Sequence, residues 1–191
     1  PPQFDPNKKY PVIIEVYGEP AGSTVQDVWS GGDLWNQYMV NQGYIYVSIE
    51  NRGANAPRGH EWRKCIYGEV GTFACEDQAR GIQDLARQYP FIDLSRIGIT
   101  GWSGGGSQTL NCMFRYPSVF HTGIAIAFVS DQRLYDTIYQ ERYMNTPQNN
   151  PEGYRKGSPI TYANGLEGNL LLIHGTGDDN VHYQSCEMLV D

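Results

Sequence analysis

Residues 96–106 read RIGITGWSGGG, and this stretch decides the fold because it joins a strand, a sharp turn and a helix start. Residues 96–100 form a short apolar run that ends in turn residues, and residues 106–116 have apolar positions at helical spacing. The turn between them has the pattern G-x-S-x-G, with Ser103 at its centre. Glycines beside the serine remove side chains that would clash in so tight a turn. We therefore predict a nucleophile elbow that exposes Ser103 at the positive end of a helix.

The same turn offers a hydrogen-bond donor for the reaction of a serine nucleophile. The backbone N–H of Gly104 is predicted to point toward any oxyanion that forms at Ser103. In a chain with 22 glycines the pattern alone is weak evidence, and the alternative is a glycine-rich turn with an idle serine. The strand before the turn and the helix after it favour the catalytic interpretation.

Strand-like and helix-like segments alternate along the rest of the chain. Predicted strands cover residues 10–17, 44–49, 97–100, 123–128 and 169–174, and predicted helices cover residues 33–41, 76–88 and 106–116. The last strand is almost continuously apolar, as expected for a parallel strand that is covered on both faces. Residues 145–158 are rich in Pro, Asn and Gly and are predicted to be a loop. The alternation predicts an α/β fold, with a mostly parallel sheet and helices on both faces, in a single domain over residues 1–191.

Composition narrows the classes of partner and site. The 191 residues are 40% hydrophobic and 18% charged, which is typical of a globular domain with its own core. A net charge of −7 without a basic cluster argues against a nucleic-acid partner. The cysteines have no metal-ligand spacing, so we predict no metal site. Cys65 and Cys75 would pair only if a hairpin joins them, and Cys112 is expected to be a small buried hydrophobe.

A serine nucleophile needs a base that removes its proton and an acid that orients the base. In α/β-hydrolases these groups follow in the order Ser, Asp or Glu, His. Asp178 lies just after the predicted strand 169–174, at the carboxyl end where catalytic groups of a parallel sheet gather. We therefore favour Asp178 as the acid, with Asp179 as the near alternative. Both aspartates are also suited to be turn or N-cap residues.

The histidine that this order requires is not found. Only His182 follows Asp178, and the fold needs a further strand and turn before its histidine. We expect His182 to be a loop or helix-start residue, and the chain to be truncated before the last strand, the last helix and the catalytic histidine. Such a truncation would leave residues 169–174 as an unprotected edge, through which we expect the chain to form homo-oligomers.

Five segments carry a resemblance to a known family. They are KKYPVIIEVYGEP (8–20), GTFACEDQ (71–78), GWSGGG (101–106), YDTIYQERYM (135–144) and HGTGDDNVH (174–182). The sequence resembles, over nearly its whole length, the catalytic domain of the prolyl oligopeptidase family of serine peptidases. The last two segments are specific to its dipeptidyl peptidase IV-like branch. The N-terminal β-propeller that supplies the amine-binding glutamates in that branch is not among these residues.

The resemblance implies a role for nine residues. Ser103 matches the nucleophile and Asp178 the acid of the triad. Tyr17 matches a tyrosine whose hydroxyl joins the Gly104 N–H in the oxyanion hole. Asn180 matches an asparagine that binds the carbonyl of the second substrate residue. The wall of a pocket for proline is matched by Val129, Tyr135, Tyr139 and Val181. Without the resemblance, the tyrosines would be interpreted as packing aromatics.

Two residues depart from the family's pattern. Gly104 stands where the family usually has a bulky tyrosine, and Gln132 stands where the pocket wall has a tryptophan. Both changes enlarge or polarise the pocket, so the preference at P1, the residue before the cleaved bond, stays open.

The resemblance implies a serine-type peptidase that acts on a peptide substrate. It would release N-terminal dipeptides with Pro or Ala at P1, need no metal or organic cofactor, and be inactive without the histidine. Members of this branch are often secreted, periplasmic or membrane-anchored, which favours an extracytoplasmic location. The alternatives are an esterase or acyl-aminoacyl peptidase on the same fold, favoured by the small Gly104, and a catalytically dead interaction module.

Overall fold

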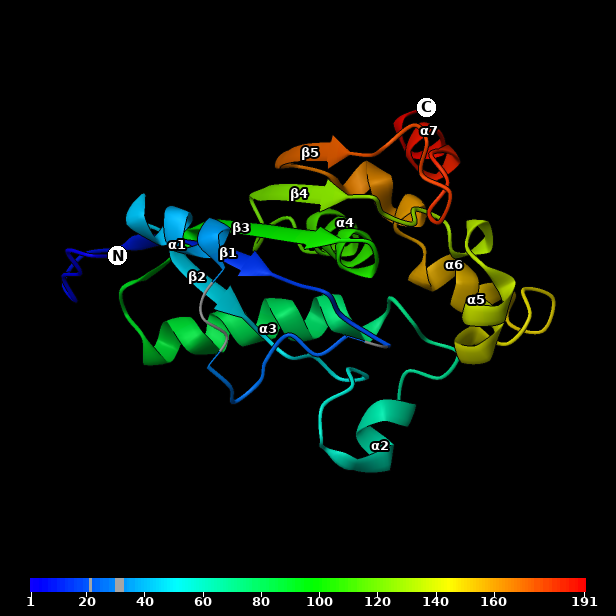
Figure 1. Cartoon of the computed structure of the whole chain (residues 1–191), viewed down its shortest axis with the longest axis horizontal. Helices are drawn as coiled ribbons and strands as arrows, with labels where there is room; N and C mark the ends of the chain where they lie inside the picture. Colours follow the sequence, from blue (N-terminus) through cyan, green and yellow to red (C-terminus); the bar gives the residue numbers. More distant parts are fainter. Residues whose placement is uncertain (21, 30–32) are drawn as a thin grey trace.

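Parallel strands form the centre of the computed structural model, which describes residues 1–20, 22–29 and 33–191. The strands are β1 (Tyr10–Glu15), β2 (Ile45–Ser48), β3 (Ile92–Trp102), β4 (Thr122–Ile126) and β5 (Asn169–Ile173). They pair in the order β2-β1-β3-β4-β5, and every pair is parallel. The arrows in Figure 1 point the same way, so the carboxyl ends of the strands meet at one edge of the sheet. The predicted α/β class with a mostly parallel sheet is confirmed.

Helices connect and cover these strands. They are α1 (Leu34–Asn41), α2 (Gly59–Lys64), α3 (Phe73–Gln88), α4 (Gly104–Arg115), α5 (Thr137–Met144), α6 (Pro151–Gly157) and α7 (Gln184–Val190). Ile82 of α3 and Met113 of α4 are fully buried and pack with Val12 and Ile97 of the strands in the main core. Cys112 of α4 belongs to the same core, as the sequence predicted. Within the described ranges, no helix is long and apolar enough to cross a membrane.

The segment 145–158 was expected to be a loop, and this expectation is wrong for its second half, which forms α6. Asn150 caps the helix, because its side-chain oxygen accepts a hydrogen bond from the backbone N–H of Gly153 at 3.1 Å. Pro151 occupies the first helical turn, where its missing N–H costs nothing. The same residue types that mark loops therefore begin a short helix here.

Cys65 and Cys75 do not form a disulfide. Cys65 is exposed after the end of α2, whereas Cys75 is buried in the first turn of α3. A turn between two helices joins them, so the hairpin that pairing would require does not form.

Strand β5 lies at the edge of the sheet, and only one of its faces is covered. Leu170 and Leu172 pack against the core, whereas Leu171 and Ile173 are 54% and 44% exposed. The expectation that this strand is covered on both faces is therefore wrong. Alternate apolar residues of β5 therefore face the core and an uncovered side of the sheet in the described part of the chain.

The carboxyl edge of the sheet gathers the segments that build the site. The turn after β1 and the turn after β3 both lie at this edge, and α5 and α6 lie beyond it (Figure 1). Because these segments are far apart in the sequence, the parallel sheet is what brings them together.

Candidate active site

Ser103 stands in a strained turn between β3 and α4. Its backbone has φ 56° and ψ −119°, a left-handed conformation that a residue with a side chain rarely adopts. Its N–H donates a hydrogen bond to the carbonyl oxygen of Ile126 in β4 at 2.9 Å. Ser107 of the next helical turn supports the same region, because its Oγ accepts the N–H of Val129 at 3.0 Å. The predicted strand, sharp turn and helix are present.

The glycines around Ser103 differ in how much space surrounds them. A Cβ at Gly105 would lie 2.2 Å from the carbonyl oxygen of Val16, so only glycine fits there. A Cβ at Gly104 would meet the ring of Tyr17 at 3.6 Å and its carbonyl oxygen at 3.8 Å, which are ordinary contacts. The Gly105 position therefore requires glycine for packing, whereas the Gly104 position leaves space in front of the serine.

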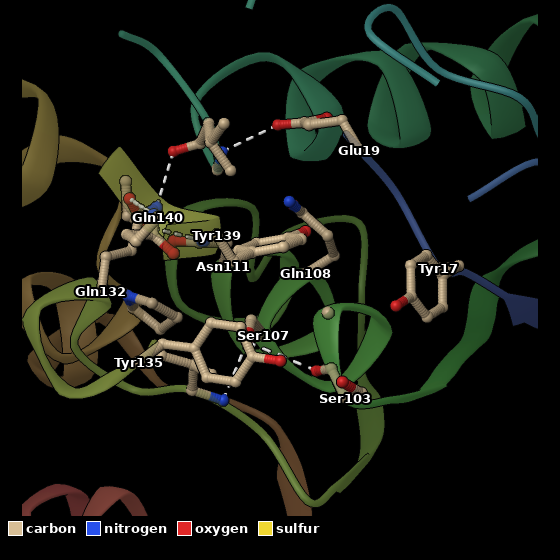
Figure 2. A pocket seen from close by; sticks show the side chains of 16 residues that line it. Tyr17, Glu19, Ser103, Ser107, Gln108, Asn111, Gln132, Tyr135, Tyr139 and Gln140 are labelled. Carbon is tan, nitrogen blue, oxygen red and sulfur yellow. Dashed lines mark hydrogen bonds between the residues drawn. The ribbon is translucent and has the colours of Figure 1, made fainter. Parts of the chain in front are cut away.

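Tyr17 lies beside this space. The Cβ position of Gly104 is 3.6 Å from Cζ of Tyr17, so the phenol end of this ring lies next to Gly104. Figure 2 shows the Tyr17 hydroxyl directed toward Ser103. The turn that carries Tyr17 approaches α4 closely, since a Cβ at Gly18 would lie 2.5 Å from Cγ of Gln108. Gly18 has φ 90°, which glycine adopts without strain. The turn after β1 and the elbow after β3 thus face each other.

A cavity of about 80 Å³ opens next to Ser103. Six of the residues predicted for the site line it, namely Ser103, Gly104, Tyr17, Val129, Tyr135 and Tyr139. The lining also contains Gln132, which the sequence singled out as a departure from an aromatic wall, and several polar residues that sequence reasoning missed. These are Glu19, Ser107, Gln108, Asn111 and Gln140 (Figure 2).

The amide of Gln132 is fixed by two hydrogen bonds. Its Nε2 donates to the carbonyl oxygen of Val70 at 2.7 Å, and its Oε1 accepts from Nε2 of Gln140 at 2.8 Å. A Cβ at Gly157 would lie 2.3 Å from Gln132 Nε2, so this glycine makes room for the amide. Gln132 therefore forms a rigid polar wall where the family pattern has a flat aromatic ring.

Glu19 is a buried acidic residue of the cavity lining. Its side-chain oxygens accept the N–H of Gly71 at 2.7 Å and an N–H of Asn51 at 2.9 Å. Burial is the main cause that raises the pKa of Glu19 to about 8, while the bond from Gly71 acts in the opposite direction. The carboxyl group is therefore mostly protonated at neutral pH.

The missed polar residues had a weak signal in the sequence. Gln108 and Asn111 are three residues apart on α4, the helix that begins directly after Ser103, so their side chains lie on the same face of this helix. Glu19 follows Tyr17 by two residues in the same turn. A search for polar residues at these offsets would have found them.

Asp178 lies in the loop after β5 and does not line the cavity. Its Oδ1 accepts the backbone N–H groups of Asn180 and Val181, both at 3.0 Å, and these bonds lower the pKa of Asp178. Its Oδ2 lies 3.8 Å from Nε2 of His174, whose buried ring donates instead to the carbonyl oxygen of Val181 at 2.7 Å. Asp178 thus serves as a turn residue in this loop, with a second oxygen that makes no hydrogen bond to the described residues. Asp179 is exposed.

Asn180 reaches the cavity through Tyr135. The Tyr135 hydroxyl donates to Oδ1 of Asn180 at 3.1 Å. The rings of Tyr135 and Tyr139 pack edge to face, with their centroids 5.2 Å apart. The ring of Tyr143 packs on Tyr139 in the same way, with a centroid distance of 5.1 Å. Val181 is buried and is not part of the cavity lining.

The cavity lining contains no histidine among the described residues. His182 is exposed just before α7, as expected of a loop residue. His60 and His121 line other hollows of the surface, and His174 is held by its own loop. In the described ranges, no group of three His, Cys, Asp or Glu side chains is placed to hold a metal ion.

Comparisons with known proteins agree with this architecture. The model of the prolyl oligopeptidase family matches residues 31–191. Two curated relatives, each named "Probable dipeptidyl-aminopeptidase B", come from Uncinocarpus reesii and Aspergillus terreus. They are 41% and 42% identical to this chain over 194 aligned positions, which cover 100% of the chain and 21% of each relative.

A solved structure shows the same fold. The dipeptidyl peptidase 4 of Porphyromonas gingivalis superposes with a TM-score of 0.92 and 42% identity, over 98% of this chain and 26% of that protein. The chain thus spans about a fifth of the length of its curated relatives. Its fold is that of an α/β-hydrolase domain, and the chain belongs to the prolyl oligopeptidase family.

Proposed function

We propose that these residues form the catalytic domain of a serine peptidase that releases dipeptides from the N-termini of peptides. The observation that carries this proposal is the strained Ser103 at the carboxyl edge of the sheet, next to a cavity that Tyr17 and Gly104 also line. The names of the relatives, dipeptidyl-aminopeptidase B and dipeptidyl peptidase 4, support the same reaction.

In the proposed mechanism, Ser103 Oγ attacks the carbonyl carbon of the P1 residue while an imidazole base takes its proton. The negative charge moves to the carbonyl oxygen, where the Gly104 N–H and the Tyr17 hydroxyl stabilise it. Collapse of this intermediate breaks the peptide bond, and the base returns its proton to the leaving amine. Water then releases the dipeptide from the serine by the same steps.

Asp178 is the proposed acid of this triad. Two backbone N–H groups keep it ionised, and its Oδ2 is left to accept a hydrogen bond from the imidazole N–H. Because none of the four histidines lines the cavity, we expect the 191 residues alone to be inactive. Loss of one member of a triad leaves only residual catalysis.

Substrate placement follows from the aromatic wall. Asn180 is proposed to bind the carbonyl of the second substrate residue, beside the Tyr135 hydroxyl that it already contacts. Val129 and Tyr139 complete a wall that suits the flat apolar ring of proline or the methyl group of alanine.

A second enzymatic function is an esterase or acyl-aminoacyl peptidase on the same fold. The small Gly104 favours it, because it leaves space in front of Ser103. A non-catalytic interaction module is the third reading, and it predicts no turnover that depends on Ser103.

One assay separates these functions. The full-length protein that carries these residues is tested on a chromogenic Ala-Pro substrate with a free amine and on its N-blocked form, with Ser103→Ala as the control. We expect cleavage of the free-amine form alone, and only with Ser103 present. Cleavage of the blocked form, or hydrolysis of simple esters without cleavage of either peptide, would establish the second function. The absence of Ser103-dependent turnover would establish the third.

We also propose that the 191 residues associate through β5. The backbone of this edge strand pairs with β4 on one side, and Leu171 and Ile173 add exposed apolar surface. Such an edge invites pairing with the same strand of a second copy.

A further inference from the structure

The loop that carries Asp178 is anchored at its ends and open in its middle. It runs from His174, directly after β5, to Val181, and the side chains of both end residues are buried. A Cβ added at Gly175 or Gly177 would meet no atom of the described residues within 4 Å, so packing does not confine either glycine. Glycine also restricts the backbone less than any other residue. The shape of this loop therefore depends on hydrogen bonds.

Two of these hydrogen bonds hold the backbone of Val181. Its N–H donates to Oδ1 of Asp178 at 3.0 Å, and its carbonyl oxygen accepts a hydrogen bond from Nε2 of His174 at 2.7 Å. The backbone N–H of Asp178 donates in turn to the carbonyl oxygen of Gly175 at 3.2 Å. The imidazole thus acts on Asp178 through one residue, because it fixes Val181 and Val181 holds the carboxylate oxygen.

The partner of His174 assigns the position of its proton. A carbonyl oxygen can only accept a hydrogen bond, so Nε2 is the nitrogen that carries the proton. Nδ1 is buried and makes no hydrogen bond with any described residue, so a second proton there would have no acceptor. The ring therefore offers one donor, and this donor is used at the end of the loop that carries Asp178.

Packing keeps the imidazole in place. Its ring packs edge to face against Phe128, with the centroids 5.4 Å apart, and against Tyr183, with a centroid distance of 5.9 Å. Phe128 is fully buried in the main core. The side chain of His174 is 0% exposed, whereas that of Asp178 is 24% exposed. The donor therefore belongs to the packed interior, while the carboxylate that depends on it lies at the surface.

We propose that His174 is a positioning residue for Asp178: its buried Nε2–H holds Val181 and thereby keeps the Asp178 carboxylate oriented toward the imidazole base. The proposal rests on the serine peptidase function proposed above, in which Asp178 is the acid of the triad. Oδ2 of Asp178 lies 3.8 Å from Nε2 of His174, which is too far for a hydrogen bond, so Oδ2 stays available to the base. A histidine that only fills space would be replaced by phenylalanine without loss of rate.

Removal of the donor tests this role in the full-length protein. His174→Phe keeps an aromatic ring between Phe128 and Tyr183 and removes both ring nitrogens, one of which has no partner to lose. We expect kcat on the free-amine Ala-Pro substrate to fall at least about 10-fold, because a small displacement of a catalytic group is costly. His174→Met is a second variant without the donor, in case the larger ring does not fit. An unchanged kcat in either folded variant would overturn the proposal.

The conservative variant His174→Gln restores a donor. Its amide places an N–H near the position of Nε2, so we expect kcat to stay within about 3-fold of the unmodified protein. Circular dichroism and the melting temperature establish that each variant is folded. A loss of kcat in folded His174→Gln as large as that in His174→Phe would overturn the proposal.

A double-mutant cycle shows whether His174 acts through Asp178. In Asp178→Asn protein the carboxylate is already absent, so adding His174→Phe is expected to lower kcat by less than about 3-fold more. The same factor of loss in both backgrounds would mean that His174 acts independently of Asp178 and would overturn the proposal. His121→Phe is the matched control, because His121 also has a buried Nδ1 without a partner among the described residues but precedes β4 at its amino end. This control should leave kcat within about 2-fold.

Hydrogen exchange gives a readout that does not need turnover. Exchange of the backbone amides of residues 175–182 is expected to be faster in His174→Phe than in the unmodified protein, while exchange in α4 stays the same. Unchanged exchange in this loop would overturn the proposal.

The same variants separate this proposal from the function on which it rests. Loss of turnover in Ser103→Ala and Asp178→Asn, with full turnover in His174→Phe, would overturn this proposal and leave the peptidase function standing. Turnover that survives Asp178→Asn would refute the proposed triad and, with it, the catalytic purpose of the His174 anchor.

Discussion

The backbone N–H of Ser103 donates to the carbonyl oxygen of Ile126 at 2.9 Å, while Ser103 keeps a left-handed conformation with φ 56°. Such a conformation costs a residue with a side chain about 1–3 kcal/mol, and glycine adopts it freely. We therefore expect Ser103→Gly to be about 1 kcal/mol more stable than Ser103→Ala in urea unfolding of the full-length protein.

The control for this comparison is Ser107, which lies inside α4. There the order should reverse, since glycine is about 1 kcal/mol less favourable than alanine within a helix. A Ser103→Ala variant as stable as Ser103→Gly would show that the turn is not strained.

Gly104 and Gly105 offer a matched pair of substitutions. Gly104→Ala places a methyl group 3.6 Å from the Tyr17 ring and is expected to leave stability unchanged or raise it by about 0.5 kcal/mol. Gly105→Ala places a methyl group 2.2 Å from the Val16 carbonyl oxygen and should destabilise by about 2 kcal/mol or more. Thermal unfolding of both variants measures the difference, and equal melting temperatures would contradict it.

Glu19 should make stability depend on pH. Its pKa is raised to about 8 from an ordinary value of 4.5, so between these values the folded state holds a proton that the unfolded state releases. This contribution is complete below pH 4.5 and is lost as pH rises to about 8, by an amount on the order of a few kcal/mol.

Glu19→Gln removes this titration. Urea unfolding at pH 5, 6.5 and 8 is expected to show a smaller loss of stability with rising pH in the variant than in the unmodified protein. Parallel pH profiles for the two proteins would mean that Glu19 is ionised when folded.

Tyr17→Phe tests the second oxyanion donor. We expect kcat to fall about 100-fold with little change in KM, because the hydroxyl acts on charge that develops only in the transition state. Tyr135→Phe is the comparison: it removes the bond to Asn180 and should act mainly on KM. A Tyr17→Phe variant with unchanged kcat would assign Tyr17 to packing alone.

Leu171 tests association through β5. Light scattering of the 191 residues is expected to show a mass that rises with concentration, and Leu171→Lys should reduce this rise, because charge on an edge strand opposes pairing. Ile138→Lys is the control, since Ile138 is 83% exposed on α5 in another part of the surface. A monomer at every concentration would refute association through this edge.

Local sequence patterns were sufficient for the elements that carry the nucleophile. Alternating apolar runs predicted the strands, and the small residues around Ser103 predicted the elbow, because backbone sterics act over only a few residues. The helix that Asn150 caps was wrongly expected to be a loop, because the residue types that favour loops also begin helices.

The sequence by itself determined the parallel α/β sheet, the elbow at Ser103 and the placement of Asp178 after β5. Only the tertiary structure decided that Glu19, Gln108, Asn111 and Gln132 meet in one cavity, because they come from three separate segments that the sheet brings together. It also decided which amide atoms there lack partners, because a hydrogen bond depends on distances across the fold that residue order does not specify.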